Sequence, residues 1–304
     1  MLKLLFNYLI APGFLLSSLV GLYATWIDRK VTAMVQYRKG PPWYQPFADI
    51  LKLMGKETYV PEGGSIFVFL SAPLFGLAAA ALASTILLSG DGFAGDLIVV
   101  LYLFMVPSLM IILGGSSSAN PLAAIGSSRE MKLILAYEIP FILAVFTVVL
   151  KCGSIVFANI IGHQAAHGMN ILSLSGIIAF TVSLLVAQAK MGLVPFDIAE
   201  AEQELMAGPL LEYSGIILAV FKLTKAILYF ALPVLLIDLF MGGIDVSSLI
   251  GVIVAAVKYV FILVLIILIK NTNPRIRIDQ AVKFFWGPVT VLAAAGFILA
   301  VVGW

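Results

Sequence analysis

Long runs of apolar residues alternate with polar connections along most of the chain. A helix needs about 17 to 25 mainly apolar residues to cross roughly 30 Å of bilayer hydrocarbon. Eight runs meet that length and predict spans over residues 4–27, 66–88, 97–113, 131–150, 171–189, 213–241, 246–269 and 284–304. Pro233 interrupts the sixth run, where a missing backbone hydrogen bond predicts a kink. The pattern therefore predicts an all-α, polytopic membrane protein with a single integral membrane domain, residues 1–304.

The first polar connection, residues 28–64, contains a shorter pattern. Four apolar residues there follow the i, i+3, i+4, i+7 spacing of one helix face: Phe47, Ile50, Leu51 and Met54. Asp49 and Lys52 fall on other faces, so the segment predicts a short amphipathic helix lying in the membrane interface. Two interpretations remain open for this helix, a plain membrane anchor and a docking platform for a soluble subunit.

Composition agrees with the pattern and argues against several classes of function. The chain is 62% hydrophobic and 11% charged, too few charges to cover a soluble domain of 304 residues. Cys152 is the one cysteine, so the chain alone cannot hold an iron-sulfur cluster, which usually needs four thiolates. His163 and His167 are four residues apart, but no third metal ligand lies near them in the sequence. We therefore expect no metal site and no redox cofactor in this chain.

The sequence also contains no nucleophile elbow, phosphate-binding loop or dinucleotide fingerprint, which argues against a self-contained enzyme. The net charge of +2 argues neither for nor against a nucleic-acid partner, and the chain has no basic cluster dense enough to follow a phosphate backbone.

Loop lysines and arginines predict the orientation of the spans. If the first loop is cytoplasmic, thirteen basic residues fall on that side against two, Lys3 and Lys151, on the other. The thirteen are Arg29, Lys30, Arg38, Lys39, Lys52, Lys56, Arg129, Lys132, Lys190, Lys270, Arg275, Arg277 and Lys283. We therefore expect a protein of the cell membrane with both termini on the outer side. The outer loop 151–170 is expected to be polar and featureless.

The link between the fifth and sixth spans, residues 190–213, is strongly acidic. It holds Asp197, Glu200, Glu202, Glu204 and Glu212. In a soluble protein such a run is usually a solvated face. Here it lies at a bilayer surface beside a span with two lysines, so we expect it to lead into that span.

Four charged residues lie inside predicted spans: Glu138, Lys222, Lys225 and Lys258. Each costs roughly 2.5 to 3.5 kcal/mol at mid-membrane, so such groups face the bundle interior, pair, or line water. A hydrated path for ions is the favoured hypothesis, and structural buried salt bridges are the alternative. Arg129 and Glu130, adjacent at the start of the fourth span, are expected to form a local structural pair.

Several motifs carry a family resemblance. PFDIAEAEQEL, GPLLEYSG, RKGPP with QPFADILKL, and GSSRE resemble the membrane subunit shared by respiratory complex I, where it is known as NADH dehydrogenase subunit 1, and energy-converting nickel-iron hydrogenases, including formate hydrogenlyase. The resemblance implies eight transmembrane helices beneath a peripheral arm. It also implies a non-redox subunit that couples electron transfer in that arm to proton or sodium-ion movement.

By that resemblance, iron-sulfur clusters and a nickel-iron centre reside in partner subunits. Those partners are hydrogenase-like large and small subunits, an iron-sulfur subunit, and other membrane subunits, including antiporter-like ones. Together with the charges inside the spans, the predicted ion pathway comprises Glu138, Asp197, Glu200, Glu202, Glu204, Glu212, Lys222, Lys225 and Lys258. The predicted docking residues are Arg38, Lys39, Gln45, Asp49, Lys52, Arg129 and Glu130.

Two details separate branches of the family. The short Pro41–Gln45 spacing resembles members without a quinone chamber, and Lys222 resembles the hydrogenase type, so a ferredoxin- or formate-linked complex is expected. Lys190 departs from both branches, which often have glutamate there, and favours a subgroup with another acceptor such as sulfur or polysulfide. A quinone-site subunit of complex I and a stand-alone ion transporter are the remaining alternatives.

Overall fold

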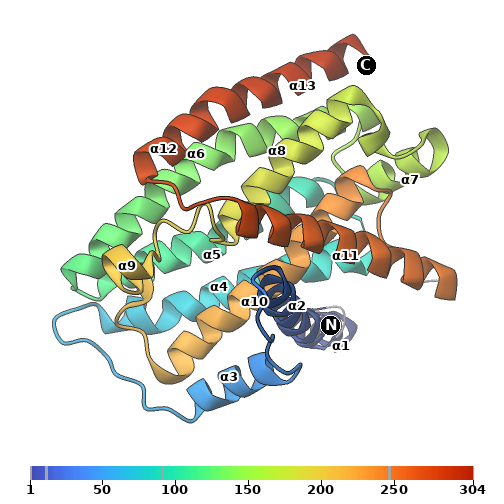
Figure 1. Ribbon diagram of the computed structural model, residues 1–304. Coiled ribbons are helices and arrows are strands. Elements are labelled where there is room, and N and C mark those ends of the chain that lie inside the picture. The colour runs from blue at the N-terminus through green and yellow to red at the C-terminus, as the bar shows by residue number, and fades with distance from the viewer. Residues whose placement is uncertain (1, 11–12, 91, 246–247, 304) are drawn as a thin grey trace.

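A computed structural model describes residues 2–10, 13–90, 92–245 and 248–303, and in these ranges every regular element is a helix (Figure 1). The long helices are α2 (Phe14–Val35), α4 (Ile66–Ser89), α5 (Asp96–Ser117), α6 (Pro121–Cys152), α8 (Leu174–Lys190), α10 (Gly215–Phe240), α11 (Leu249–Thr272) and α13 (Thr290–Val302). The shorter ones are α1 (Leu2–Leu9), α3 (Gln45–Met54), α7 (Phe157–His167), η1 (Asn170–Leu172), α9 (Glu202–Leu205), η2 (Gly208–Leu210), α12 (Ile278–Phe284) and η3 (Phe285–Val289).

The prediction of an all-α, polytopic membrane protein is confirmed. Among the described residues, seven helices or continuous helical stretches are long and apolar enough to cross a membrane. α8, at 17 residues, is a shorter apolar helix at the position of the predicted fifth span. The amphipathic segment after Pro42 also forms the helix expected of it, α3.

Several predicted boundaries were wrong for identifiable reasons. α6 begins ten residues before the predicted fourth span, because Asn120 caps it through Leu122 N–H and Pro121 suits a first helical turn. In the first span, α1 ends at Leu9 and α2 begins at Phe14, and residues 11 and 12 between them lie outside the described residues. The loop 151–170 is not featureless, because α7 forms within it. The predicted limits at residues 246 and 304 lie outside the described residues.

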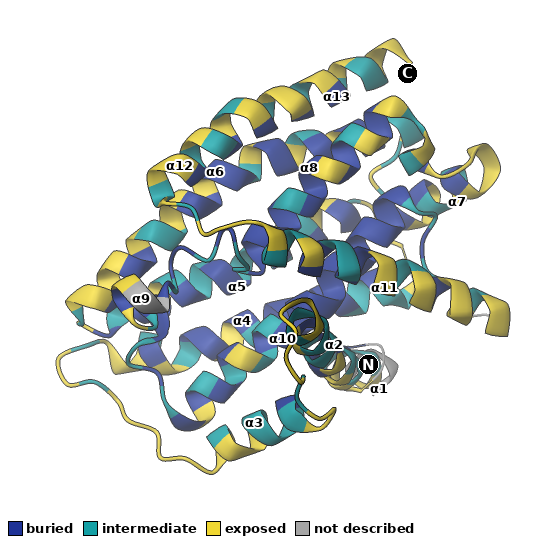
Figure 2. Ribbon diagram, viewed as in Figure 1, coloured by how far each residue is buried: buried dark blue, intermediate teal, exposed yellow. Residues whose placement is uncertain are grey.

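α10 occupies the centre of the bundle. Every residue from 226 to 240 is buried, and Figure 2 shows this stretch surrounded by other helices. α2 packs closely against it at Gly21, where a Cβ atom would lie 2.0 Å from the Ala226 carbonyl oxygen. Small residues allow such close approach of membrane helices. α10 itself runs from one end of the bundle to the other.

The two ends differ in character. The end with α3, α9 and the first turn of α10 carries most of the ion pairs described below, and we call it the charged end (Figure 1). The opposite end, with α7 and the last turn of α10, is called the α7 end.

Two prolines inside helices leave backbone carbonyls without their usual N–H donors. In each case, a tyrosine hydroxyl from another segment donates the hydrogen bond instead. Pro73 in α4 cannot donate to the Phe69 carbonyl, and the Tyr213 hydroxyl donates to that oxygen at 3.1 Å. Pro233 in α10 likewise leaves the Tyr229 carbonyl free, and the Tyr259 hydroxyl donates to it at 3.1 Å. These two bonds tie α4 to the acidic link and α10 to α11.

Replacing Tyr213 with phenylalanine should therefore lower stability by about 1 to 3 kcal/mol, the usual cost of a buried acceptor left unsatisfied. Thermal unfolding of the purified protein in detergent measures this loss. Tyr102→Phe is the matched control, because that side chain is 67% exposed on α5. Equal unfolding temperatures for the two variants would show that the Phe69 carbonyl does not need the hydroxyl.

Candidate functional site

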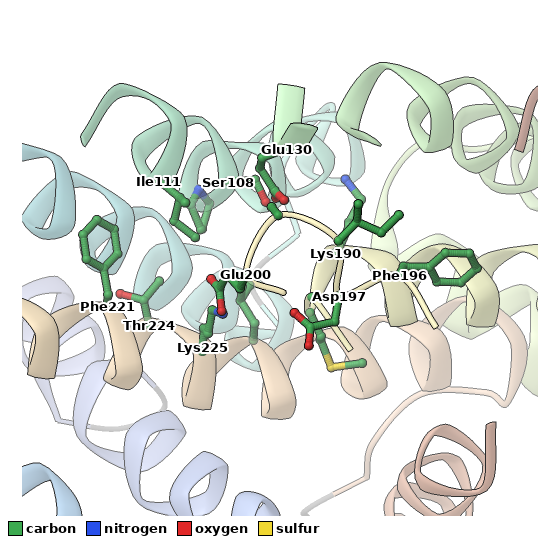
Figure 3. A pocket seen from close by; sticks show the side chains of 16 residues that line it. Ser108, Ile111, Glu130, Lys190, Phe196, Asp197, Glu200, Phe221, Thr224 and Lys225 are labelled. Carbon is green, nitrogen blue, oxygen red and sulfur yellow. The ribbon is translucent and has the colours of Figure 1, made fainter. Parts of the chain in front are cut away.

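A charged cluster surrounds a small internal cavity at the charged end. The Lys225 ammonium of α10 donates to Glu200 Oε2, and both side chains are partly buried. Glu130 of α6 and Asp197 of the acidic link line the same cavity (Figure 3). Its volume is about 20 Å³, which is enough for roughly one water molecule among these polar groups. Three carboxylates and two lysines, Lys225 and Lys190, line this cavity, and such an arrangement can hold and pass a proton.

The acidic link folds inward because of its small residues. Gly208 has a φ of +53°, and a Cβ atom there would lie 1.9 Å from the Ala199 carbonyl oxygen. Pro209 packs against Gly126 of α6, where a Cβ atom would lie 2.6 Å from the proline ring. The glycine and proline of the GPLLEY motif thus hold the link against α6 and place Glu200 over α10.

A second ion pair lies deeper between α6 and α8. Lys190 Nζ is 2.9 Å from Glu138 Oε2, and the lysine is only 4% exposed. The ammonium also lies over the rings of Tyr137 and Phe141, at 5.0 and 4.9 Å from their centroids. Two aromatic faces and one carboxylate therefore compensate the charge of this buried lysine. Sequence reasoning singled out both residues but did not pair them.

The other acidic residues of the link contact groups at the surface. Asp197 pairs with Arg275 at 2.8 Å, Glu204 pairs with Arg129 at 2.6 Å, and Glu212 accepts from the Asn120 side chain. The hydrogen bond and positive charge of Arg129 lower the pKa of Glu204, so this pair forms at neutral pH and is lost as the pH falls through that lowered pKa. Glu202 lies in α9, and its side chain is outside the described part of the chain.

These pairs border a charged surface hollow. Its volume is about 350 Å³, and its charged lining residues are Arg129, Asp197, Glu204, Arg275, Arg277 and Asp279. The hollow lies directly beside the cavity, since Asp197 lines both. Groups of both signs at the surface offer hydrogen bonds and charge to a protein partner.

α3 carries several of the residues predicted to bind a peripheral arm. Asp49 accepts from Arg29 at 2.7 Å and from Gln45 at 2.9 Å. Burial raises the pKa of Asp49, but these bonds and the Arg29 charge outweigh it and leave that pKa lowered. Lys52, with Arg38 and Lys39 in the loop before α3, is exposed. α3 is thus fastened to α2 by Asp49 and presents its lysine outward.

Two sequence-based placements were wrong, and a third residue lies apart from the rest of the predicted pathway. Lys222, about one turn before Lys225 on α10, is exposed near α3 and not inside the bundle. Lys258 lies toward the α7 end, where its ammonium donates to the carbonyl oxygens of Met241 and Gly243. Glu130 does not pair with Arg129, since it lines the cavity while Arg129 reaches Glu204.

Within the described residues, the members of the predicted ion pathway lie in separate places. Glu130, Asp197, Glu200 and Lys225 meet at the cavity, and Glu138 pairs with Lys190, which also lines it. Between Lys225 and the α7 end, α10 presents a buried and almost wholly apolar stretch, residues 226–237. At about 1.5 Å per residue this stretch is roughly 18 Å long.

Three buried aspartates of the described residues were missed by sequence reasoning: Asp96 at the start of α5, and the two described here, Asp28 and Asp238. Asp28 of α2 pairs with Lys270 of α11 at 2.6 Å, and the Tyr229 hydroxyl donates to it at 3.4 Å. Asp238, near the end of α10, is also buried. Both lie within or beside predicted spans, so the cost of a buried charge could have identified them.

No group of three or more His, Cys, Asp or Glu side chains among the described residues is placed to hold a metal ion. The histidines of α7 stack on one another, with ring centroids 4.4 Å apart. That redox cofactors reside in partner subunits stays a prediction.

Comparison with known proteins places this chain in a family. The family model described as NADH dehydrogenase matches residues 9–301. The H subunit of NADH-quinone oxidoreductase from Thermomicrobium roseum is 35% identical, with 96% of this chain and 94% of that protein covered. The corresponding protein of Anoxybacillus flavithermus is 33% identical, with 87% and 83% covered.

A solved structure is similar over its whole length. It is a chain of the membrane-bound sulfane sulfur reductase, an archaeal respiratory membrane complex. That chain is 32% identical to this one, with a TM-score of 0.89 and coverage of 99% of this chain and 100% of its own length. The chain belongs to the NADH dehydrogenase family, as a relative of the H subunit of NADH-quinone oxidoreductase and a membrane subunit of a respiratory complex.

Proposed function

We propose that this chain is the non-redox anchor and coupling subunit of a multisubunit, energy-converting oxidoreductase. In this role it binds a peripheral arm that carries the iron-sulfur clusters, and it couples electron transfer there to proton or sodium-ion movement. The charged end faces the cytoplasm, as the distribution of lysine and arginine predicts. The observation that carries the proposal is the cavity where Glu130, Asp197, Glu200 and Lys225 meet beside a charged surface hollow.

The coupling part of the proposal rests on the position of the ion pairs. A redox or conformational change in a bound arm alters the charge at the surface hollow, and Asp197 connects that hollow to the cavity. Because the Glu200–Lys225 pair is partly buried, a change in nearby charge shifts its proton equilibrium more strongly than it would in bulk water. The pair is therefore suited to respond to events in a neighbouring subunit.

The electron acceptor is proposed to be a sulfur compound. Lys190, which departs from the glutamate of the complex I and hydrogenase branches, is a buried partner of Glu138 in this chain. The similar length and fold of the sulfane sulfur reductase chain support the same acceptor class. A hydrogenase-type complex with a nickel-iron centre in a partner is the second candidate. It is favoured by the short Pro41–Gln45 segment and by Lys222.

The test is to identify the polypeptides that co-purify with this chain after mild detergent extraction. We expect iron-sulfur subunits, a large subunit related to those of hydrogenases, and further membrane subunits. A large subunit that keeps four nickel-binding cysteines would favour the hydrogenase candidate, and one that lacks them would favour the sulfur candidate. A chain that purifies alone and moves ions in liposomes would contradict the proposal.

In the same experiment, Lys52→Glu should release the peripheral subunits while the membrane subunits stay bound, because it reverses an exposed charge on α3. Lys283→Glu is the matched control, another exposed lysine outside the predicted docking set. Full co-purification of the peripheral subunits with Lys52→Glu would remove the docking role of α3.

A further inference from the structure

Side chains from three other elements donate hydrogen bonds to the backbone carbonyls at the end of α10. Gln164 of α7 donates to the Asp238 carbonyl at 2.8 Å, and Asn170 donates to the Leu239 carbonyl at 2.9 Å. Lys258 of α11 donates to the Met241 carbonyl at 2.6 Å. A helix end leaves such carbonyls without partners of its own, so these three side chains satisfy the α7 end of α10.

The side-chain carboxyl group of Asp238 takes no part in these three hydrogen bonds. The residue is 2% exposed, and its Oδ2 atom has no hydrogen-bond partner among the described residues. The backbone N–H of Ile244 hydrogen-bonds the group, and Lys258 is close enough to interact with it electrostatically. The Lys258 ammonium is nevertheless bonded to backbone carbonyls and not to the carboxyl.

Few other charged groups of the described residues lie on the elements around Asp238. α7 presents Gln164 to this turn, and its histidines, His163 and His167, stack on each other. α8 packs its Phe180 ring against Phe240, and the following loop carries Asp245. Among the described residues, Lys258 is the cation that interacts with this carboxyl, and it therefore favours the ionised form.

A second buried aspartate shows what a structural carboxylate looks like in this protein. Asp96, 1% exposed at the start of α5, accepts from the backbone N–H of Leu97 at 2.7 Å and from that of Phe157 at 3.1 Å. Its charge is compensated by backbone donors, and its function is to join α5 to α7. Asp238 is as deeply buried and lacks an equivalent set of donors, so a purely structural role does not account for it.

We propose that Asp238 is a proton-binding site at the α7 end, which takes up and releases a proton while Lys258 stabilises its ionised form. Uptake forms an O–H bond on the carboxylate, and release returns that proton to water on the same side of the membrane. The proposal rests on the proposed coupling function, because α10 runs as one helix from the Lys225 turn to Asp238. Movement of α10 at the cavity thereby reaches this carboxyl without a continuous water path.

The test uses the assembled complex with Asp238→Asn, and Asp96→Asn as the matched control. Infrared difference spectra between acidic and alkaline pH should show a protonated-carboxyl band that Asp238→Asn removes and Asp96→Asn keeps. In proteoliposomes, Asp238→Asn should keep electron transfer and lose ion pumping, because a neutral amide can no longer change its charge when α10 moves. Asparagine has the shape and neutrality of a protonated carboxyl, so normal assembly is expected.

Each contrary outcome has a separate meaning. An infrared band that Asp238→Asn leaves unchanged would overturn the inference, because the proton then lies on another group. An Asp238→Asn complex that fails to assemble would also overturn it, because the fold then requires the ionised carboxylate and does not accept its neutral form. Normal pumping by Asp238→Asn together with lost pumping by Lys225→Met would overturn the inference and leave the proposed function intact. Normal pumping by both variants would overturn the proposed function as well.

Discussion

Replacing Glu138 with leucine is expected to destabilise the protein by about 3 to 5 kcal/mol, the usual cost of breaking a buried ion pair from one side. The variant leaves the Lys190 ammonium, whose side chain is 1% exposed, between two aromatic rings with no carboxylate at 2.9 Å. Thermal unfolding of the protein in detergent and the yield of assembled complex measure the effect. The unfolding temperature and the yield of assembled complex should both fall sharply.

The double variant Glu138→Leu with Lys190→Met supplies the control. It removes both charges and fills the space with apolar groups, and such replacements are often neutral or stabilising. Stability should therefore return toward that of the unmodified protein. A double variant as unstable as Glu138→Leu alone would show that the loss arises from packing and not from the unpaired ammonium.

The membrane architecture was predictable because it depends on local properties. The length of each apolar run fixes where a span can form, and the spacing of Phe47, Ile50, Leu51 and Met54 is enough to predict α3. The start of α6 shows the limit of this reasoning. Its extra turns before residue 131 are rich in polar and small residues, so they follow from the Asn120 cap and not from hydropathy.

The partners of the charged residues were not predictable in the same way. Glu138 and Lys190 are 52 residues apart, and only the packing of α6 on α8 brings them together. Glu130 and Arg129 are neighbours in sequence, yet successive side chains of a helix point about 100° apart, so one faces the cavity and the other faces α9. Lys222 and Lys225 are three residues apart on α10, yet Lys222 is exposed and Lys225 pairs with Glu200.

The helix-breaking prolines show a further limit. The loss of a backbone hydrogen bond at Pro233 follows from its missing N–H, but the Tyr259 hydroxyl that replaces the lost donor comes from another helix. The same holds for Tyr213 and the carbonyl of Phe69. Such contacts depend on tertiary structure, and a single sequence gives no direct signal for them.

Lys225→Met is expected to abolish ion pumping while electron transfer continues. The substitution removes the ammonium that holds Glu200 at the cavity, and it leaves Glu130 and Glu200 there without the charge between them. A proton bound in the cavity is then no longer displaced by changes at the surface hollow. Lys222→Met is the matched control, since that lysine lies one turn away on the same helix but is exposed.

The most direct measurement is the number of ions moved per electron transferred by the complex in sealed proteoliposomes, compared between Lys225→Met and Lys222→Met. The account predicts that both variants transfer electrons at similar rates and that only Lys225→Met has lost ion movement. Equal ion movement by the two variants would contradict the claim that the charges around this cavity couple electron transfer to transport.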